Sequence, residues 1–236
     1  MSTLSAEDQD LIDRWRRLET LDVLGDHWWW RPGWRVGRSF YTWHVTFEDD
    51  PTVADLAADW QAGLNLPGLD LVPADGLHLT MQGVGFTDDI DPTELSRIID
   101  AARTRFSGLA PFTLALGPAD ADPEGIPLAV RPWHPVQHLR TTLREAIADV
   151  WGTGHVPEAA DGFRPHVTLA YSSGGTPATD VRERLAALRK SITPIEVIVR
   201  AASLIRLNRD EKHYRWTTEA TIPLAATGRV GHGNHA

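Results

Sequence analysis

Apolar and polar residues follow two different periods along this chain, and each period predicts one kind of secondary structure. Between residue 6 and about residue 24, Leu11, Trp15 and Leu18 recur every three or four residues, which is the spacing of one face of an amphipathic helix. The same period predicts helices at about 53–64, from about 92, at 134–150 and at 179–190. Short apolar runs bounded by Gly, Pro and polar turns predict strands at 40–47, 77–84, 112–116, 126–131, 165–171, 195–207 and 213–224.

The order of these elements predicts the fold class and the organisation of the chain. Strands alternate with helices, and the last two strands are joined by a polar turn, an order that indicates an α+β or mixed α/β fold. No shift in composition marks a linker between two large domains. We therefore expect an N-terminal helix and Trp-rich extension at 1–37, a main domain at 38–225 and a disordered tail at 226–236.

Composition excludes several classes of protein. Of the 236 residues, 42% are hydrophobic and 23% are charged, and no apolar run approaches the roughly 18 residues that span a bilayer. The acidic start carries no apolar segment of a secretory signal, so we expect a cytoplasmic protein with no membrane partner. The absence of cysteine excludes disulfides, zinc–thiolate sites, iron–sulfur clusters and a thiol nucleophile.

Charge and tryptophan content restrict the function further. The formal charge of −9 argues against an extended basic surface for nucleic acid, though not against a small nucleotide or an RNA end. Only Lys190 and Lys212 are lysines, and neither lies in a phosphate-binding loop or in a context that suggests a nucleotidyl-lysine enzyme. Of the 10 tryptophans, five fall between residues 28 and 43, where we expect them to fill a core or cap a lobe.

Three of the expected strands carry the pattern H-x-T, beginning at His44, His78 and His166. Residues i and i+2 of a strand point to the same face, so each histidine projects beside its threonine while the residue between them faces the core. An imidazole can transfer a proton and a hydroxyl can donate a hydrogen bond to a phosphate oxygen. Two such units that face each other could therefore hold a phosphodiester between two imidazoles.

His78 and His166 lie in matching surroundings. A Gly-containing loop follows each strand, a helix begins about 13 residues after each histidine, and another strand comes next. This order is a degenerate internal repeat of strand, loop, helix and strand. The segment after His44 has no glycine loop and its helix begins sooner, so His44 is expected to be structural or to line a cleft.

The two repeated segments, GLHLTMQGVGF at 76–86 and FRPHVTLAY at 163–171, carry a resemblance to a known family. Over roughly residues 38–225 the sequence resembles the 2H phosphoesterase superfamily, in its branch of 2′-5′ RNA ligase-like and cyclic phosphodiesterase proteins. The resemblance implies an α+β fold with two pseudo-symmetric lobes of strands and helices around a central cleft lined by both histidines. It implies neither a metal nor another cofactor.

The function that follows is a metal-independent phosphodiesterase, or 2′-5′ RNA ligase-like enzyme, acting on a 2′,3′-cyclic phosphate or a 2′-5′ linked nucleotide. His78 and His166 would serve as general base and general acid, in an order that pseudo-symmetry leaves open. Thr80 and Thr168 would bind the phosphate oxygens. The expected partner is a small nucleotide or an RNA terminus with a cyclic phosphate, bound by a monomer.

Three further residues are weaker candidates for substrate binding. Arg164 has the face parity of His166, so it could reach the cleft or form a surface ion pair, and His44 could line the cleft. Tyr171 lies at odd spacing from His166 and faces the other way in an unbroken strand, so it would need a β-bulge to reach a substrate. A non-catalytic module that binds a nucleotide or an RNA end, and an enzyme acting on ADP-ribose 1″,2″-cyclic phosphate, remain alternatives.

Overall fold

The computed structural model describes residues 4–225, so the disordered tail expected at 226–236 lies outside the described residues. The described elements alternate between helices and strands, as the sequence predicts. The helices are α1 (Ala6–Glu19), α2 (Pro51–Gly63), α3 (Pro92–Phe106), α4 (Trp133–Trp151) and α5 (Ala178–Leu188), with 3₁₀ turns at Ala74–Gly76 and Thr153–His155. The strands are β1 (Phe40–Thr46), β2 (Leu69–Leu71), β3 (His78–Phe86), β4 (Phe112–Ala119), β5 (Gly125–Arg131), β6 (His166–Ser172), β7 (Ile195–Val199), β8 (Ala201–Asn208) and β9 (Arg215–Pro223).

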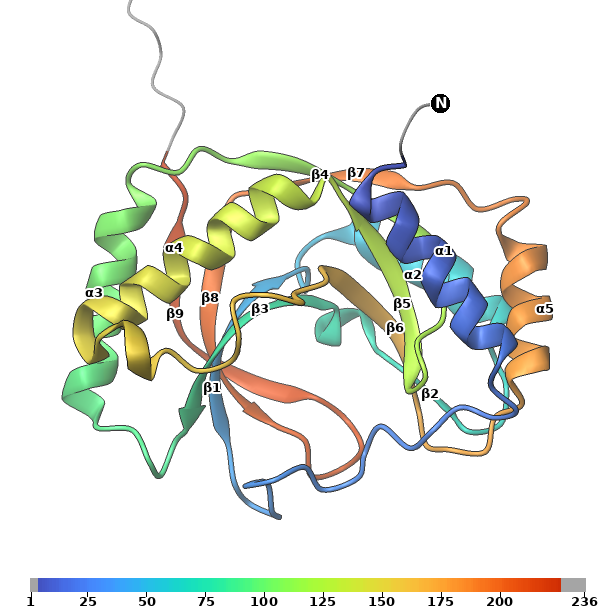
Figure 1. The fold of residues 1–236 in the computed structure, drawn as a ribbon, viewed down its shortest axis with the longest axis horizontal. Helices are drawn as coiled ribbons and strands as arrows, with labels where there is room; N and C mark the ends of the chain where they lie inside the picture. Colours follow the sequence, from blue (N-terminus) through green and yellow to red (C-terminus); the bar gives the residue numbers. More distant parts are fainter. Residues whose placement is uncertain (1–3, 226–236) are drawn as a thin grey trace, which may run out of the picture.

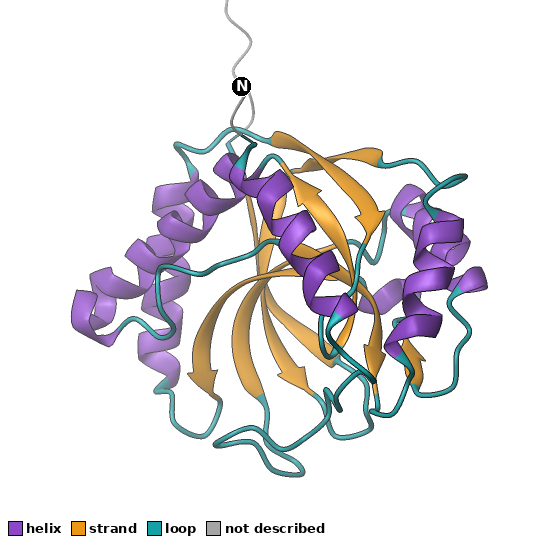
Figure 2. Ribbon diagram, turned by 45° about the vertical axis from the view of Figure 1, so that its right-hand side comes forward, coloured by secondary structure: helices purple, strands orange, loops and turns teal. Residues whose placement is uncertain are grey.

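The strands form one curled sheet made of two halves. Its order is β7-β4-β5-β6-β3-β1-β8-β9, with β2 added beside β6, and all recorded pairings are antiparallel. Helices α3 and α4 pack together over the half that contains β3 and β9, whereas α2 and α5 lie over β6 and β7 (Figures 1 and 2). The two halves join where β3 meets β6, so the join lies in the middle of the molecule.

The order of strand, helix and strand predicted for the repeat is present in the structure, but the glycine loop expected after the first motif is wrong. Gly83 and Gly85 lie within β3 and pair with Thr42 and Tyr41 of β1. Helix α3 follows β3 and begins at Pro92, where the Asp91 side chain accepts the backbone N–H groups of Thr93 and Glu94. Helix α5 follows β6 and begins at Ala178. The strands that come next, β4 and β7, pair with each other at one edge of the sheet. Each histidine motif is therefore followed by a helix on the outside of its own half.

One expected strand is wrong in its extent. The segment 195–207 is two strands, because β7 ends at Val199 and β8 begins at Ala201. Strand β7 pairs with β4, whereas β8 lies between β1 and β9 on the other half of the sheet. The hydrophobic pattern continues through Arg200 because both strands bury one face, so it gives no sign that the chain crosses from one half to the other.

The tryptophans do not share one role. Trp43 and Trp60 are fully buried in the core, and Trp28 is 8% exposed. Trp29 and Trp30, in contrast, are 48% and 47% exposed, so the expected core or capping role does not hold for these two side chains.

The N-terminal extension packs closely on the main domain. Val23 and Asp26 form isolated bridges with Pro177 and Ser173, on the loop between β6 and α5, and Leu24 is completely buried. The extension therefore reaches the strand that carries the second H-x-T motif. None of the helices between residues 4 and 225 is long and apolar enough to cross a lipid bilayer.

Candidate active site

The two predicted motifs meet where the halves of the sheet join. Leu79 pairs with Val167 in antiparallel register, and both side chains are buried in the core. The residues on either side of this pair project to the opposite face. Antiparallel pairing puts His78 on the side of Thr168 and Thr80 on the side of His166, so the four side chains form two crossed imidazole–hydroxyl pairs.

The same hydrogen bond orients both imidazoles. His78 Nδ1 lies 2.8 Å from the carbonyl oxygen of Gly76, and His166 Nδ1 lies 2.9 Å from that of Arg164. A carbonyl oxygen only accepts, so Nδ1 is the protonated nitrogen of each neutral ring. Within the described residues, neither Nε2 has a hydrogen-bond partner, so each is left with a free lone pair for proton transfer.

Aromatic rings surround the first histidine. His44 stacks parallel to His78, with ring centroids 4.4 Å apart, and the edge of Trp216 lies at 5.5 Å. Burial lowers the pKa of His78 to about 4, and the hydrogen bond to the Gly76 carbonyl opposes that shift. His78 is therefore neutral at physiological pH before substrate binds.

His44 contacts both residues of the first motif, His78 and Thr80. It is 1% exposed, and its Nε2 lies 3.4 Å from Thr80 Oγ1. Burial, followed by the nearby His78, keeps the pKa of His44 well below its ordinary value. A neutral ring stacked on His78 fixes the position of that imidazole, so His44 is a positioning residue and has almost no surface to offer a substrate.

A cavity of about 400 Å³ opens beside the second motif. His166 and Thr168 line it, and so do Arg31 and Glu124. Its full lining is His27, Arg31, Asp122, Pro123, Glu124, Gly125, Pro127, His166, Thr168 and Tyr171. The N-terminal extension thus contributes two residues to a cavity that we assigned from sequence to the main domain alone.

Tyr171 lines this cavity together with His166, which corrects the orientation expected from its odd spacing. Strand β6 contains a bulge: Ala170 pairs with Ile126 and Thr168 pairs with Pro127, so Leu169 is an extra residue without a partner in β5. The bulge turns the side chains that follow it to the other face. Tyr171 then stacks on His27, with ring centroids 4.1 Å apart.

Arg164 acts in the site through its backbone. Its carbonyl holds His166, whereas its side chain, 44% exposed, forms an ion pair with Asp10 of α1 at 3.0 Å. Asp10 also pairs with Arg14 at 2.7 Å, and Arg14 pairs with Asp122 of the cavity wall at 2.6 Å. Burial lowers the pKa of His166, and the hydrogen bond to Arg164 and the charge of Asp122 oppose the shift.

A second buried imidazole closes the cavity on the side of the extension. His27 Nε2 lies 2.8 Å from the hydroxyl of Tyr214, and its Nδ1 lies 3.4 Å from a carboxylate oxygen of Glu124. Burial and the positive charges of Arg31 and Arg209 lower the pKa of His27 to about 3. This ring is neutral, so its contribution to the cavity is shape and hydrogen bonding.

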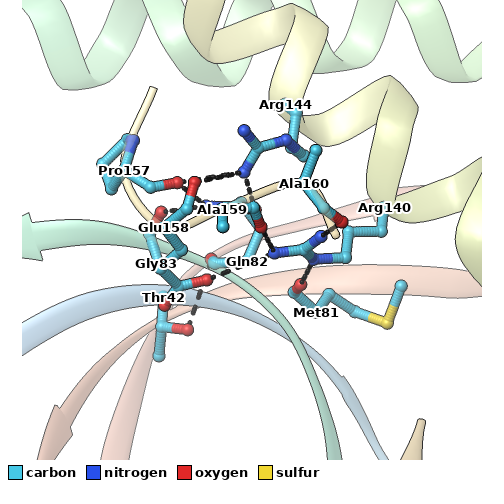
Figure 3. Close-up of polar contacts among 10 residues, drawn as sticks. All are labelled: Thr42, Met81, Gln82, Gly83, Arg140, Arg144, Pro157, Glu158, Ala159 and Ala160. Atoms are coloured by element: carbon cyan, nitrogen blue, oxygen red, sulfur yellow. Dashed lines mark hydrogen bonds and ion pairs between the residues drawn. The ribbon is translucent and has the colours of Figure 1, made fainter. Parts of the chain in front are cut away.

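The loop that leads to His166 is fastened to the strand that carries His78. The guanidinium of Arg140, in α4, donates to the carbonyl oxygens of Met81 in β3 and of Ala159 and Ala160 in the loop, at 2.8–2.9 Å (Figure 3). Arg144 donates to the Gln82 side chain and to the Pro157 and Glu158 carbonyls of the same loop. These two arginines tie both motif strands to one helix.

Several residues around the site have no motif that sequence could have revealed. His27, Arg31, Asp122, Glu124, Tyr214 and Trp216 reach it from the extension, from the β4–β5 turn and from the start of β9. The one available signal was the concentration of Trp between residues 28 and 43, which we assigned to packing. No cluster of three or more His, Asp or Glu side chains between residues 4 and 225 is arranged to hold a metal ion.

Comparison with known proteins agrees with this architecture. The family model of the 2′-5′ RNA ligase superfamily matches residues 47–211. Among solved structures, TT0787 of Thermus thermophilus is similar with a TM-score of 0.60 and 21% identity, over 81% of this chain and 100% of that one. E. coli LigT complexed with 3′-AMP is similar with a TM-score of 0.60 and 19% identity, over 79% of this chain and 98% of that one.

A structure described as a phosphoesterase is similar with a TM-score of 0.58 and 18% identity, over 80% of this chain and 99% of that one. A search of curated proteins by sequence gave no match. Identities this low show the shared fold, whereas the family model covers well over half of the chain. The chain belongs to the 2′-5′ RNA ligase superfamily, and its fold is that of the 2H phosphoesterases, as its two H-x-T strands predicted.

Proposed function

We propose that this protein is a metal-independent phosphodiesterase that opens a 2′,3′-cyclic phosphate or cleaves a 2′-5′ linked nucleotide. The observation that carries the proposal is the antiparallel register of Leu79 with Val167, which sets two imidazoles and two threonines on one face. The nucleotide 3′-AMP in the E. coli LigT structure supports a nucleotide as the substrate class.

Two imidazoles are enough for the proton transfers of this reaction. One neutral histidine accepts a proton from water as the water oxygen attacks phosphorus. The other, protonated, donates to the ribose oxygen as its bond to phosphorus breaks. The hydroxyls of Thr80 and Thr168 donate hydrogen bonds to the non-bridging oxygens, where negative charge develops. With the 5′-hydroxyl of a second RNA end in the place of the attacking water, its oxygen bonds to phosphorus as a ribose oxygen leaves the cyclic phosphate, and the two ends are joined.

The test is turnover of nucleoside 2′,3′-cyclic monophosphates by the wild type, His78→Ala and His166→Ala. We expect each substitution to lower kcat by at least about 10²-fold, since general acid–base catalysis contributes 10²–10⁴-fold. Activity should also persist in EDTA. Lys190→Ala, a substitution away from both motifs, is the matched control and should keep wild-type activity.

Two results would contradict the proposal. Nucleotide binding by the wild type without turnover would indicate a binding module. Activity lost in EDTA and restored by added metal would exclude the metal-independent mechanism. Turnover of ADP-ribose 1″,2″-cyclic phosphate in preference to nucleoside 2′,3′-cyclic phosphates would keep the chemistry and change the substrate.

A further inference from the structure

Two residues that line the cavity, Arg31 and Glu124, have no role in the proton transfers proposed above. The Arg31 guanidinium donates to a Glu124 carboxylate oxygen at 2.8 Å. Arg31 belongs to the N-terminal extension, ahead of the residues 47–211 that the family model matches. The cavity is thus built partly by a segment outside the family's common part.

The charges around Arg31 and Glu124 disfavour the binding of a second phosphate. Glu124 neutralises Arg31, and Asp122 adds another carboxylate to the wall, where it pairs with Arg14. A polyanion would be repelled by the carboxylates, whereas a neutral group with hydrogen-bond donors and acceptors would be accepted. The volume of about 400 Å³ is in the range of sites that hold a small organic ligand.

The arrangement of flat groups favours an aromatic ligand. The Arg31 guanidinium lies over the ring of Trp29, 5.6 Å from its centroid, and the Trp29 indole donates to Glu124 at 3.3 Å. Trp29 is 48% exposed, so it supports Arg31 from the solvent side. The stacked rings of Tyr171 and His27 line the same cavity. A guanidinium plane backed by an indole is a surface on which nucleobases stack.

We propose that Arg31, Trp29 and Glu124 form a subsite for the nucleobase of the substrate. Given the proposed function, on which this inference rests, the base lies against the Arg31 plane with its polar edge toward Glu124, and the phosphate lies at His166 and Thr168. The N-terminal extension thereby selects nucleoside cyclic phosphates over cyclic phosphates of bare sugars.

The experiment compares cytidine 2′,3′-cyclic monophosphate with methyl ribofuranoside 2′,3′-cyclic phosphate, which lacks the base. Wild type should prefer the nucleotide by about tenfold or more in kcat/KM, the usual contribution of one stacked base. Arg31→Met and Trp29→Ala should each raise KM for the nucleotide about tenfold with little change in kcat. Neither substitution should change the kinetics of the methyl riboside substrate.

Trp30→Ala is the matched control, because Trp30 is 47% exposed but, unlike Trp29, forms no hydrogen bond or cation–π contact with Arg31 or Glu124 in the described residues. It should keep the wild-type preference. The subsite is disproved if wild type shows no preference for the base, or if Arg31→Met and Trp29→Ala affect both substrates equally.

A binding measurement tests the subsite independently of the catalytic proposal. If neither substrate is turned over, calorimetric titration measures the affinity of the protein for adenosine 2′-monophosphate and for ribose 5-phosphate. Tighter binding of the nucleotide, weakened by Arg31→Met, supports the subsite without catalysis. Equal affinities for the two ligands overturn it.

Discussion

At the scale of single residues, the two histidines share an orientation but not an environment. Each ring is held through Nδ1 by the carbonyl of the residue two positions earlier. His78 then packs among rings, whereas His166 lies beside the charged chain formed by Asp10, Arg14 and Asp122. Since burial is the largest influence on both, the pKa of each lies below its ordinary value of 6.5.

These shifts predict an acidic optimum for the free enzyme. The pH dependence of kcat/KM reports the pKa values of the essential base and acid before substrate binds. With the pKa of His78 at about 4 and that of His166 also lowered, the bell-shaped profile should peak below pH 6.5. Bound phosphate favours protonated rings, so the kcat profile should peak at higher pH than that of kcat/KM. Steady-state kinetics from pH 4 to 9 measures both, and a kcat/KM maximum above pH 7 would contradict the prediction.

The two histidines proposed as catalytic could be found from sequence, and the residues around them could not. His78 and His166 were predictable because an H-x-T strand fixes which side chains share a face, whatever the rest of the fold. The direction of Tyr171 was not, because it depends on a bulge at Leu169 that only the pairing with β5 creates. The same limit applies to Arg31, whose contribution depends on where the extension docks.

At the scale of secondary-structure elements, α4 holds the two motif strands in place. Arg140 is almost completely buried, and its three donor nitrogens satisfy one carbonyl of β3 and two of the loop before β6. Its guanidinium also stacks over Phe163, 4.6 Å from the ring centroid. The carbonyl of Met81 belongs to a buried residue and needs a donor, whereas Ala159 and Ala160 are exposed residues of the loop. The loop therefore depends on one side chain of a helix from the other half of the molecule.

Replacing Arg140 by methionine should destabilise the protein and disturb the second motif. The substitution keeps most of the apolar stem and leaves the buried Met81 carbonyl without a donor, at about 1–3 kcal/mol. It also removes two hydrogen bonds to the loop and the stacking on Phe163. We expect a loss of about 3 kcal/mol in the free energy of unfolding, or roughly 10 °C in Tm. Thermal and urea unfolding measure it.

Arg103→Met is the matched control for this substitution. Arg103 is 57% exposed and pairs with Asp100 on the surface of α3, so its loss should cost less than about 0.5 kcal/mol. Equal effects of the two substitutions would show that the loop before β6 does not need Arg140.

At the scale of the whole molecule, the sequence predicts the helices and strands but not where the chain crosses from one half of the sheet to the other. Helices and strands alternate as expected, although Gly83 and Gly85 lie inside β3 and only Gly174 and Gly175 lie in a loop after a motif strand. The crossing at Arg200, which sends β7 and β8 to opposite halves, has no signature in the hydrophobic pattern. The position of the N-terminal extension on the main domain has no signature in the sequence either. Its amphipathic helix would have the same hydrophobic pattern on any apolar surface.

Unfolding is a property of the whole molecule, and its pH dependence should follow the buried histidines. His27, His44 and His78 are neutral in the folded protein, with pKa values of about 3 for His27, far below normal for His44 and about 4 for His78. In the unfolded chain each has an ordinary pKa near 6.5. Their contribution to stability is therefore complete above about pH 6.5. It falls as pH decreases, because protons then bind only to the unfolded chain, until the folded pKa values are reached.

Between pH 7 and pH 5 we expect each of the three histidines to cost about 2 kcal/mol of unfolding free energy. Carboxylates with an ordinary or lowered pKa have little influence in this window, because they titrate below it. Burial raises the pKa of Asp120 in the folded protein, and this carboxyl group acts in the opposite direction. Urea unfolding at pH 7, 6 and 5 measures the loss, and His44→Phe should reduce it by about a third while keeping a ring stacked on His78. A stability that stays constant from pH 7 to 5 would mean that these imidazoles titrate in the folded protein as they do in the unfolded chain, so that burial does not keep them neutral.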